Sequence, residues 1–360
     1  MAMKSVQLRN GSYIVREGPR IVSLPDGMIR LDVHAVPLGE FDVGIMYGLS
    51  RFAKKSRLDE GLGSGFVGVV TETTKGSKFL LGEFVFGFAA NPMKDSTLVS
   101  EITVLESVCT RCPGRLTPTE SASLIVDLMI AERTLRLCKT TDVDSILITG
   151  GTTPMARAII EVAKSSMFGV EWVATTVACL SDREYAESIG ADETFDSSCN
   201  GGDWSRAFVS GANRKEYDIV IDVVGDSKHA KQLVKPLTGR LVSLLNKETP
   251  EEVLNFDERV GNSFLSSLNR RLLGSRLVGD FLTGCSGRRR KCKGSEYLTV
   301  IPTGDGEILE RLCVLIDTEA ITGNVEECIS LSQVDEYVSR IKKLPFTMRG
   351  RIVVDLSISP

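Results

Sequence analysis

Two kinds of hydrophobic patterning divide the chain. In residues 1–123, apolar and polar residues alternate over short runs that glycine separates, as in Ile29–Ala35 and Gly61–Thr73. This period of two predicts strands, and many short strands with glycine turns are typical of a small β-barrel. Beyond residue 123, short apolar runs alternate with stretches whose apolar residues recur every three or four positions. That order predicts strands and helices around a parallel sheet, so we expect an α/β protein.

The second part of the chain contains the expected elements in a regular order. We expect strands at Ser145–Thr149, Glu171–Val177, Phe195, Asp218–Val224, Arg240–Leu245, Tyr297–Ile301 and Arg349–Asp355. We expect helices at Thr119–Leu137, Pro154–Lys164, Asp182–Ile189, Lys228–Leu237, Gly306–Ile316 and Gln333–Lys342, and a helix followed by a strand within Ser263–Leu282. No internal repeat or low-complexity segment interrupts this order.

The stretch from Asp144 to Lys164 predicts a phosphate-binding corner. Its strand ends at Gly150-Gly151, and a helix with one apolar face follows. The N-terminus of such a helix offers unpaired N–H groups and a positive dipole end to a diphosphate. Glycine is expected at three spaced positions, which here hold Gly150, Thr153 and Ala156. Ala156 is small enough for the packing position, but Thr153 places a β-branched side chain where the diphosphate would lie. The sequence therefore predicts a dinucleotide corner with a weakened phosphate site.

Composition bounds the class of protein. A length of 360 residues suits two domains, and 42% hydrophobic with 25% charged residues is ordinary for a globular chain. A net charge of −4 argues against a general nucleic-acid or membrane-surface role, and no apolar run is long enough to span a bilayer. Nine scattered cysteines favour reduced thiols inside a cell. We expect a cytoplasmic protein, with a mitochondrial one as the alternative because the N-terminus is basic and has no acid before Glu17.

The layout of a β-barrel, an α/β domain and a C-terminal return resembles the medium-chain dehydrogenase/reductase superfamily. The resemblance is to its zinc-independent quinone oxidoreductase and enoyl reductase branch. Six stretches carry it: Gly63–Val70, Gly82–Phe86, the turn at Gly150, Ile189–Asp192, Asp222–Gly225 and Arg349–Val354. The run from Tyr297 to Ile321 is similar to the reticulon-interacting mitochondrial members. The resemblance implies a GroES-like domain over 1–123, a Rossmann domain with a doubly wound parallel sheet over 124–300, and a return to the first domain over 301–360.

The resemblance argues against a catalytic zinc ion. Zinc-dependent relatives place a Cys in a first-domain loop and Gly-His-Glu on the glycine-rich strand. Here the loop reads Leu38-Gly39-Glu40-Phe41-Asp42 and the strand reads Gly63-Ser64-Gly65. The only histidines, His34 and His229, lie in an expected strand and at an expected helix start, and we expect structural or surface roles for both. Cys109 and Cys112 form a lone Cys-x-x-Cys, interpreted as two unpaired thiols, with a redox dithiol as the alternative.

Cofactor preference is predicted from the end of the second Rossmann strand. An NAD site needs an acid there for the ribose hydroxyls, but Thr175–Ala178 contains none. Ser181 and Arg183 follow and offer groups for a 2′-phosphate, so NADP(H) is favoured over NAD. Alternatively, Ser181 and Glu184 form a capping box and Arg183 is solvated. The candidate cofactor-binding residues are Gly150, Gly151, Thr153, Ala156, Ser181, Arg183, Val224 and Gly225, the last two at the strand end expected to face the nicotinamide ribose.

The expected nicotinamide end lacks several family residues. The resemblance places an Asn at Gly39, a Tyr at Gly44 and a Thr at Ile130, and none is present. Asp42 matches a family Asp, and Tyr47 offers a phenol close to the position of the missing Tyr. These two residues are the candidate catalytic residues, with an exposed turn residue and a packed aromatic as the alternative interpretations.

Two functions follow from these patterns. The first is an NADPH-dependent reductase that transfers hydride to a quinone, enone or enoyl substrate. The second is a catalytically degenerate member of the fold that acts as an interaction or scaffold subunit, in an organellar complex for instance. By analogy we expect a homodimer, with Tyr297–Ile301 as the edge strand that joins two sheets. The basic run Arg288–Lys293 is interpreted as a solvated loop, so no nucleic-acid partner is expected.

Overall fold

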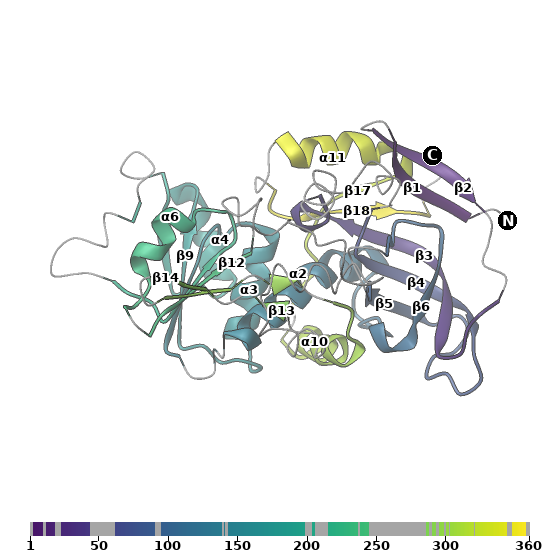
Figure 1. Cartoon of the computed structure of the whole chain (residues 1–360), viewed down its shortest axis with the longest axis horizontal. Helices are drawn as coiled ribbons and strands as arrows, with labels where there is room; N and C mark the ends of the chain where they lie inside the picture. Colours follow the sequence, from purple (N-terminus) through teal and green to yellow (C-terminus); the bar gives the residue numbers. More distant parts are fainter. Residues whose placement is uncertain are drawn as a thin grey trace, which may run out of the picture. The chain divides into compact units, whose positions relative to one another are not determined.

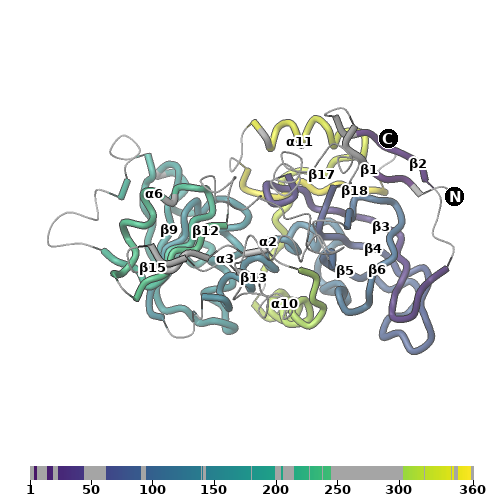
Figure 2. The backbone as a smooth tube through the Cα atoms, in the orientation of Figure 1, coloured from purple at the N-terminus to yellow at the C-terminus, as the bar shows by residue number. Residues whose placement is uncertain are grey.

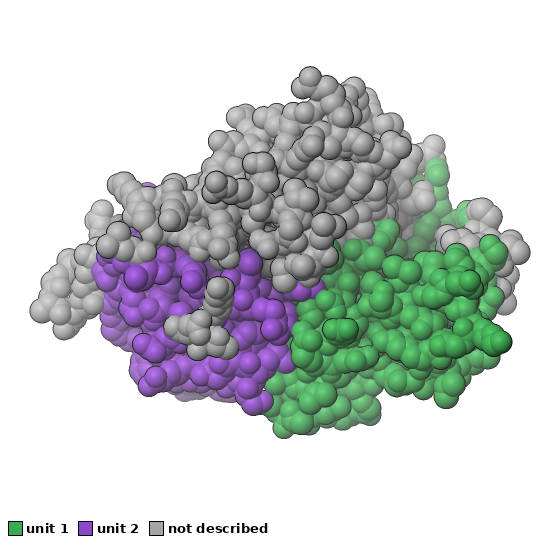
Figure 3. Space-filling model, turned by 60° about the horizontal axis from the view of Figure 1, so that its bottom comes forward, with its two compact units in different colours: residues 1–129, 303–360 green, residues 130–302 purple. Residues whose placement is uncertain are grey.

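The chain forms two compact units. The first contains Met1–Met129 and Thr303–Pro360, and the second contains Ile130–Pro302 (Figure 3). Figures 1 and 2 trace the chain through both. The computed structural model describes residues 3–9, 12–18, 23–43, 62–90, 95–138, 140, 143–198, 204–205, 215–236, 238–244, 286–287, 290–292, 295–298, 300–301, 303–319, 321–343 and 348–357. The expected elements within Ser263–Leu282 lie outside the described residues.

Unit 1 is built on a sheet in which chain-distant strands are neighbours. The order is β17-β18-β3-β4-β5-β7, and β6 also pairs with β3. The strands are β3 (Met28–Leu38), β4 (Gly65–Thr73), β5 (Phe84–Phe88), β6 (Glu101–Leu105), β7 (Cys109–Arg111), β17 (Val325–Ile329) and β18 (Arg351–Asp355). A separate antiparallel hairpin joins β1 (Met3–Arg9) to β2 (Ser12–Gly18). Because β18 pairs with β3, the end of the chain lies beside its first long strand.

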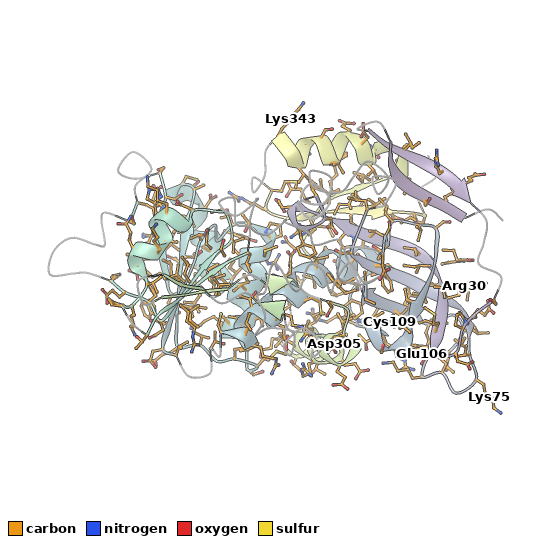
Figure 4. All side chains as sticks on the ribbon, viewed as in Figure 1. Arg30, Lys75, Glu106, Cys109, Asp305 and Lys343 are labelled. Atoms are coloured by element: carbon orange, nitrogen blue, oxygen red, sulfur yellow. The ribbon has the colours of Figure 1, made fainter. Side chains whose placement is uncertain are left out.

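The core of unit 1 surrounds β3. This strand pairs with β4, β6 and β18, so both of its edges are hydrogen-bonded to neighbouring strands, and Ile29 and Leu31 have no exposed surface. Even Arg30 on β3 is only 2% exposed, and its guanidinium Nη1 lies 2.8 Å from a carboxylate oxygen of Glu72 (Figure 4). The predicted alternation of Ile29–Ala35 therefore marks the strand correctly but underestimates its burial, because the sequence does not show which side chains of other strands will pack against Arg30.

Helical segments lie between the strands of unit 1, including the 3-10 turn η2 (Glu106–Val108) and four others. The four others are α2 (Pro118–Leu137), which continues into unit 2, α10 (Gly306–Thr318), the 3-10 turn η7 (Leu331–Gln333) and α11 (Val334–Lys343). Asp305 begins α10 by accepting the N–H groups of Glu307 at 3.1 Å and Ile308 at 3.2 Å, which is a standard N-cap (Figure 4). A Cβ on Gly306 would lie 2.8 Å from the carbonyl oxygen of Cys109, so glycine lets α10 start directly on β7.

Unit 2 contains a largely parallel sheet in the order β10-β9-β8-β11-β12-β15-β14. Its strands are β8 (Ser145–Ile148), β9 (Trp172–Val177), β10 (Glu193–Asp196), β11 (Ile219–Asp222), β12 (Arg240–Ser243), β14 (Arg290–Cys292) and β15 (Ser295–Leu298). The helices α3 (Pro154–Lys164), α4 (Arg183–Ser188) and α6 (Ser227–Ala230) lie beside this sheet (Figure 1). The chain runs outward from β8 to β9 and β10, and then returns to place β11 on the other side of β8. The order therefore reverses between β8 and β11, which is where open α/β sheets bind ligands.

Two sequence-based expectations for unit 2 need correction. The helix expected over Lys228–Leu237 is only α6 and the 3-10 turn η6 (Lys231–Leu233), because Val234 is extended and bridges to Tyr217. The edge strand expected at Tyr297–Ile301 is also wrong. Its first part is β15, which lies between β12 and β14. It is not at the edge because β14, just before it in the chain, pairs with it in antiparallel fashion. Its last part is β16 (Val300–Ile301), which pairs with β13 (Ser286–Gly287) in a small separate sheet.

Among the described residues, no helix is both long enough and apolar enough to cross a membrane.

Candidate functional site

The glycine corner of unit 2 follows β8. Gly150 has φ +73°, which favours glycine, and a Cβ at this position would overlap the Cγ1 of Val224. A Cβ on Gly151 would overlap the side chain of Thr175. Both glycines are therefore required by packing within the protein. The N–H groups of Gly150 and Gly151 donate to the hydroxyl and the carbonyl oxygen of Thr176, at 2.9 and 2.8 Å, which fixes the turn to the end of β9.

Thr153 caps the helix that this turn leads into. Its backbone is extended, and its Oγ1 accepts the N–H of Ala156 at 3.3 Å, so Thr153 is the N-cap of α3. The side chain is buried, with 3% exposed. Pro154 at the first helical position has no N–H to offer. Sequence reasoning placed Thr153 in the path of a phosphate but missed that its hydroxyl satisfies one of the helix's own donors.

The corner fits a diphosphate with a reduced set of donors. Among the described residues, the N–H groups of Thr152 and Met155 have no hydrogen-bond partner, and both belong to the turn that opens α3. A helix N-terminus with free N–H groups is suited to an anion. Ala156 has no exposed surface, consistent with a packing position between helix and sheet. The geometry of the corner is thus intact, while its capacity to donate hydrogen bonds is lower than that of an uncapped helix.

The end of β11 is tied to the same corner. Asp222 has no exposed surface, and its Oδ1 accepts the hydroxyl of Thr149 at 2.9 Å and the N–H of Gly225 at 3.0 Å. The hydroxyl of Thr149 in turn accepts the N–H of Val223 at 2.9 Å. Val224 and Gly225 therefore lie beside Gly150, at the point where the strand order reverses. The structure brings these sequence-predicted residues together, although their contact with a cofactor remains a prediction.

An Asp–His pair follows β11 that sequence reasoning did not select. Asp226 Oδ1 lies 2.6 Å from Nδ1 of His229, and the indole N–H of Trp204 donates to the other carboxylate oxygen at 2.7 Å. The sequence assigns His229 only to a helix start. An Asp three residues before a His at a helix start is the signal for such a pair, since residues three apart share a helix face.

Ser181 and Arg183 lie at the start of α4. Ser181 does not form the alternative capping box with Glu184: the N-cap is Asp182, and the Ser181 Oγ lies 2.8 Å from the Sγ of Cys179. The reason is that residues 180–182 form a 3-10 turn, so the α-helix begins one residue later than a box would need. Arg183 Nε donates to the hydroxyl of Thr194 at 2.8 Å. Its side chain is about half exposed, so a role at a 2′-phosphate stays a prediction.

A buried cluster of charged side chains lies in unit 1. Asp42, in the helical turn after β3, is 4% exposed. Its Oδ1 accepts the hydroxyl of Ser64 at 2.6 Å, and its Oδ2 accepts the N–H of Gly39 at 3.2 Å. The alternative interpretation of Asp42 as an exposed turn residue is therefore wrong. Zinc-dependent relatives would place metal ligands in the loop that contains Asp42 and on the strand that begins near Ser64. In this chain the two stretches are joined by the hydrogen bond between Ser64 and Asp42.

Arg351 from β18 completes this charge cluster, which we define as Glu40, Asp42, Ser64, Asp127 and Arg351. The Nε of Arg351 donates to Asp127 at 2.7 Å and its Nη2 donates to the other oxygen of the same carboxylate. Its Nη1 donates to Glu40 at 3.1 Å. A Cβ at position 39 would overlap the guanidinium, so Gly39 is required where the resemblance places an Asn. All five side chains of the cluster are at least nine-tenths buried.

Burial dominates the electrostatics of the cluster. Burial raises the pKa of Asp42 to about 6, against the hydrogen bond from Ser64 and the positive charge of Arg351, which lower it. Burial alone would lower the pKa of Arg351, but the carboxylates of Asp127 and Glu40 outweigh burial and raise it above the ordinary value. Arg351 is therefore a permanent cation, and burial favours the protonated form of Asp42.

The remaining candidates are placed as follows. Tyr47 and Gly44 lie outside the described residues. Within the described part of the chain, no group of three or more His, Cys, Asp or Glu side chains is arranged to hold a metal ion. Cys109 and Cys112 are free thiols, and burial raises the pKa of both, which makes the thiolate hard to form.

Comparison with solved structures defines the fold class. The chain is similar to the quinone oxidoreductase from Coxiella burnetii, at 18% identity over 99% of this chain and 100% of that one, with a TM-score of 0.72. It is similar to an NAD-dependent alcohol dehydrogenase, at 17% identity over 99% and 100%, with a TM-score of 0.74. The CurK enoyl reductase shares 16% identity over 98% and 99%, with a TM-score of 0.68. No family model matches the chain.

These similarities confirm the predicted fold class. The chain has the fold of the medium-chain dehydrogenase/reductase proteins, with a GroES-like domain and a Rossmann domain. Its structural neighbours are oxidoreductases of this type, and the identities of 16–18% establish the fold alone.

Proposed function

We propose that this protein is a zinc-independent, NADP(H)-dependent reductase of a quinone, an enone or an enoyl thioester. The observation that carries the proposal is the intact glycine corner at the reversal of strand order, with Gly150 and Gly151 packed against Val224 and Thr175. Its structural neighbours include a quinone oxidoreductase and an enoyl reductase, which support this choice of substrates. The cofactor, when bound, supplies hydride.

The binding roles follow from the positions of the chain's own groups. We assign the N–H groups of Thr152 and Met155 and the turn at Gly150 and Gly151 to the diphosphate. Val224 and Gly225 line the same corner, and Ala156 allows α3 to pack closely. Ser181 and Arg183 are assigned to the 2′-phosphate, because β9 ends without an acid and a guanidinium binds phosphate well. Asp42 is assigned to the substrate end, and Tyr47 stays a candidate there.

Turnover and cofactor preference test this proposal. Purified protein is expected to oxidise NADPH in the presence of a naphthoquinone, an enone or a crotonyl thioester, and to prefer NADPH over NADH. Arg183→Gln is expected to raise the Kd for NADPH about 10-fold and to leave that for NADH unchanged. Arg136→Gln is the matched control, since Arg136 is an exposed arginine of the same unit whose guanidinium bonds Glu132. Equal affinity of the wild type for both cofactors contradicts the assignment of the 2′-phosphate site.

A catalytically silent scaffold subunit is the second candidate. Two observations favour it: Thr153 satisfies the Ala156 N–H that an anion would use, and Arg351 fills the space of a side chain at position 39. This candidate predicts that neither the wild type nor Thr153→Gly binds NADPH at millimolar concentration. Binding by either protein rejects it. A homodimer is expected under both candidates, and light scattering at a monomer mass contradicts that expectation.

A further inference from the structure

The charge cluster in unit 1 contains more acids than bases. Glu40, Asp42 and Asp127 supply three carboxyl groups, and Arg351 supplies the single cation that the structure describes among them. All four side chains are at least nine-tenths buried. A buried charge without a partner costs several kcal/mol, so such a group binds a proton instead. One proton is therefore expected in this cluster at mildly acidic pH.

The hydrogen bonds decide which carboxyl group holds it. Asp127 receives two N–H groups of the guanidinium and Glu40 receives a third. Asp42 receives none from Arg351, and its partners are one hydroxyl and one backbone N–H. Burial raises the pKa of Asp42 to about 6, in agreement with this geometry.

We propose that Asp42 is the proton reservoir of this protein and that Ser64 is the hydroxyl through which its proton leaves toward the substrate. The proposal rests on the proposed reductase function and names a residue, Ser64, that the sequence offers only as the replacement of a metal ligand. The oxygen atoms of Ser64 and Asp42 are 2.6 Å apart, within the usual distance for proton transfer along a hydrogen bond. Ser64 lies in the turn that leads into β4, and Asp42 in the turn that leaves β3, so both are held by the central strands.

The proton balance is as follows. Reduction of a quinone or an enone adds one hydride and one proton to the substrate. The O–H bond of Ser64 breaks as its proton passes to the substrate oxygen, and Ser64 Oγ takes the proton of Asp42. The Asp42 carboxylate that remains is stabilised by the N–H of Gly39, the hydroxyl of Ser64 and the charge of Arg351, and it is opposed by the charge of Asp127. Water restores the proton to Asp42 before the next turnover.

A titration that needs no activity tests the reservoir. Infrared spectra of the full chain with ¹³C-labelled aspartate are expected to show a buried carboxylic C=O band that disappears with a midpoint near pH 6. Asp42→Asn is expected to remove the band. Ser64→Ala is expected to raise the midpoint, because the hydroxyl that stabilises the carboxylate is lost. Ser330→Ala, which removes another buried hydroxyl of unit 1, is the control and is expected to change nothing. A band that is absent in the wild type, or that survives Asp42→Asn, overturns the proposal.

Kinetics test the role of Ser64. Ser64→Ala is expected to lower kcat by about 10–100-fold and to leave the Kd for NADPH unchanged, since proton transfer by a positioned group contributes on that order or more. Wild-type kcat is expected to fall as pH rises above about 6, and Asp42→Asn is expected to lose this dependence. Wild-type turnover with an unchanged kcat in Ser64→Ala overturns the relay alone. Absence of any wild-type turnover overturns the proposed function, and the infrared titration then shows whether Asp42 still holds the proton.

Discussion

The glycine corner of unit 2 and the charge cluster of unit 1 solve different problems. The corner is built from glycines that make room for Val224 and Thr175 and a threonine that caps α3, and its buried Asp222 accepts hydrogen bonds from within the same corner. The cluster instead buries three carboxyl groups around one guanidinium. Much of the corner can be explained by folding alone, because its glycines and its cap also satisfy the protein, whereas the N–H groups of Thr152 and Met155 have no partner among the described residues. The cluster is harder to explain in this way, because burial of three carboxyl groups beside one guanidinium reduces stability. Functional sites commonly contain such unfavourable groups, so the cluster adds to the support that the corner gives to the proposed function.

The largest expected effect separates the two regions by stability. Arg351→Met leaves Asp127 and Glu40 buried without their cation, and it is expected to destabilise unit 1 by about 3–5 kcal/mol. Urea unfolding followed by circular dichroism measures this loss. Arg183→Met in unit 2 is the control, since it removes an exposed ion pair with Glu187 and is expected to change stability by less than about 1 kcal/mol. Equal effects of the two variants would show that the cluster is not the buried network described.

The second effect concerns the dependence of stability on pH. The folded-state pKa of Asp42, about 6, lies above the ordinary value of 3.8, so the folded protein binds this proton more tightly than the unfolded chain. The contribution of Asp42 to stability is therefore complete below about pH 4, and about 3 kcal/mol of it is lost as pH rises through 6. Asp42→Asn is expected to remove this loss and to be more stable than the wild type at pH 7.5. Thermal unfolding of the wild type and of Asp42→Asn at pH 4.5 and 7.5 measures this difference. If Asp42→Asn is less stable than the wild type at both pH values, the raised pKa of Asp42 is contradicted.

A smaller effect tests the space at position 39. Gly39→Ala places a methyl group on the guanidinium of Arg351 and is expected to cost about 1–3 kcal/mol, as overpacked cores do. Gly114→Ala is the matched control, since a Cβ there meets nothing within 4 Å, and it is expected to be neutral. Chemical unfolding of both variants compares them. A tolerated Gly39→Ala would mean that Arg351 does not occupy this space.

The smallest effect tests the cap of the corner. Thr153→Ala removes the acceptor of the Ala156 N–H and is expected to cost about 0.5–2 kcal/mol, whereas Thr153→Ser keeps the hydroxyl and is expected to cost less. Thermal unfolding of the two variants gives the difference. If both variants lose the same amount, the methyl group of Thr153 matters and its hydroxyl does not.

Local patterns in the sequence were sufficient for much of the fold. The helix expected over Pro154–Lys164 is α3 with the same bounds, because its start is marked by Pro154 and its apolar face is regular. Long-range pairing was not available from local patterns. The pairing of β18 with β3 joins strands that are far apart in the chain.

The site was predicted less completely for the same reason. The turn at Gly150 and the strand end at Val224 have local signals, and the structure brings them together. The charge cluster combines residues that are far apart in the chain. Glu40 and Arg351, which are in contact, are separated by 311 residues. No local pattern marks Arg351 as the group that replaces a side chain at position 39. The guanidinium of Arg351 reaches the space beside Gly39 only because β18 pairs with β3.

Titration of the full chain with NADPH, followed by nicotinamide fluorescence, tests the central claim that the corner of unit 2 still holds a dinucleotide. The account predicts saturable binding by the wild type below millimolar concentration, tighter binding by Thr153→Gly, and loss of binding by Gly151→Val, whose side chain overlaps Thr175. Thermal unfolding confirms that each variant is folded. If neither the wild type nor Thr153→Gly binds NADPH at millimolar concentration, the claim that the corner holds a dinucleotide is contradicted and the scaffold candidate is left.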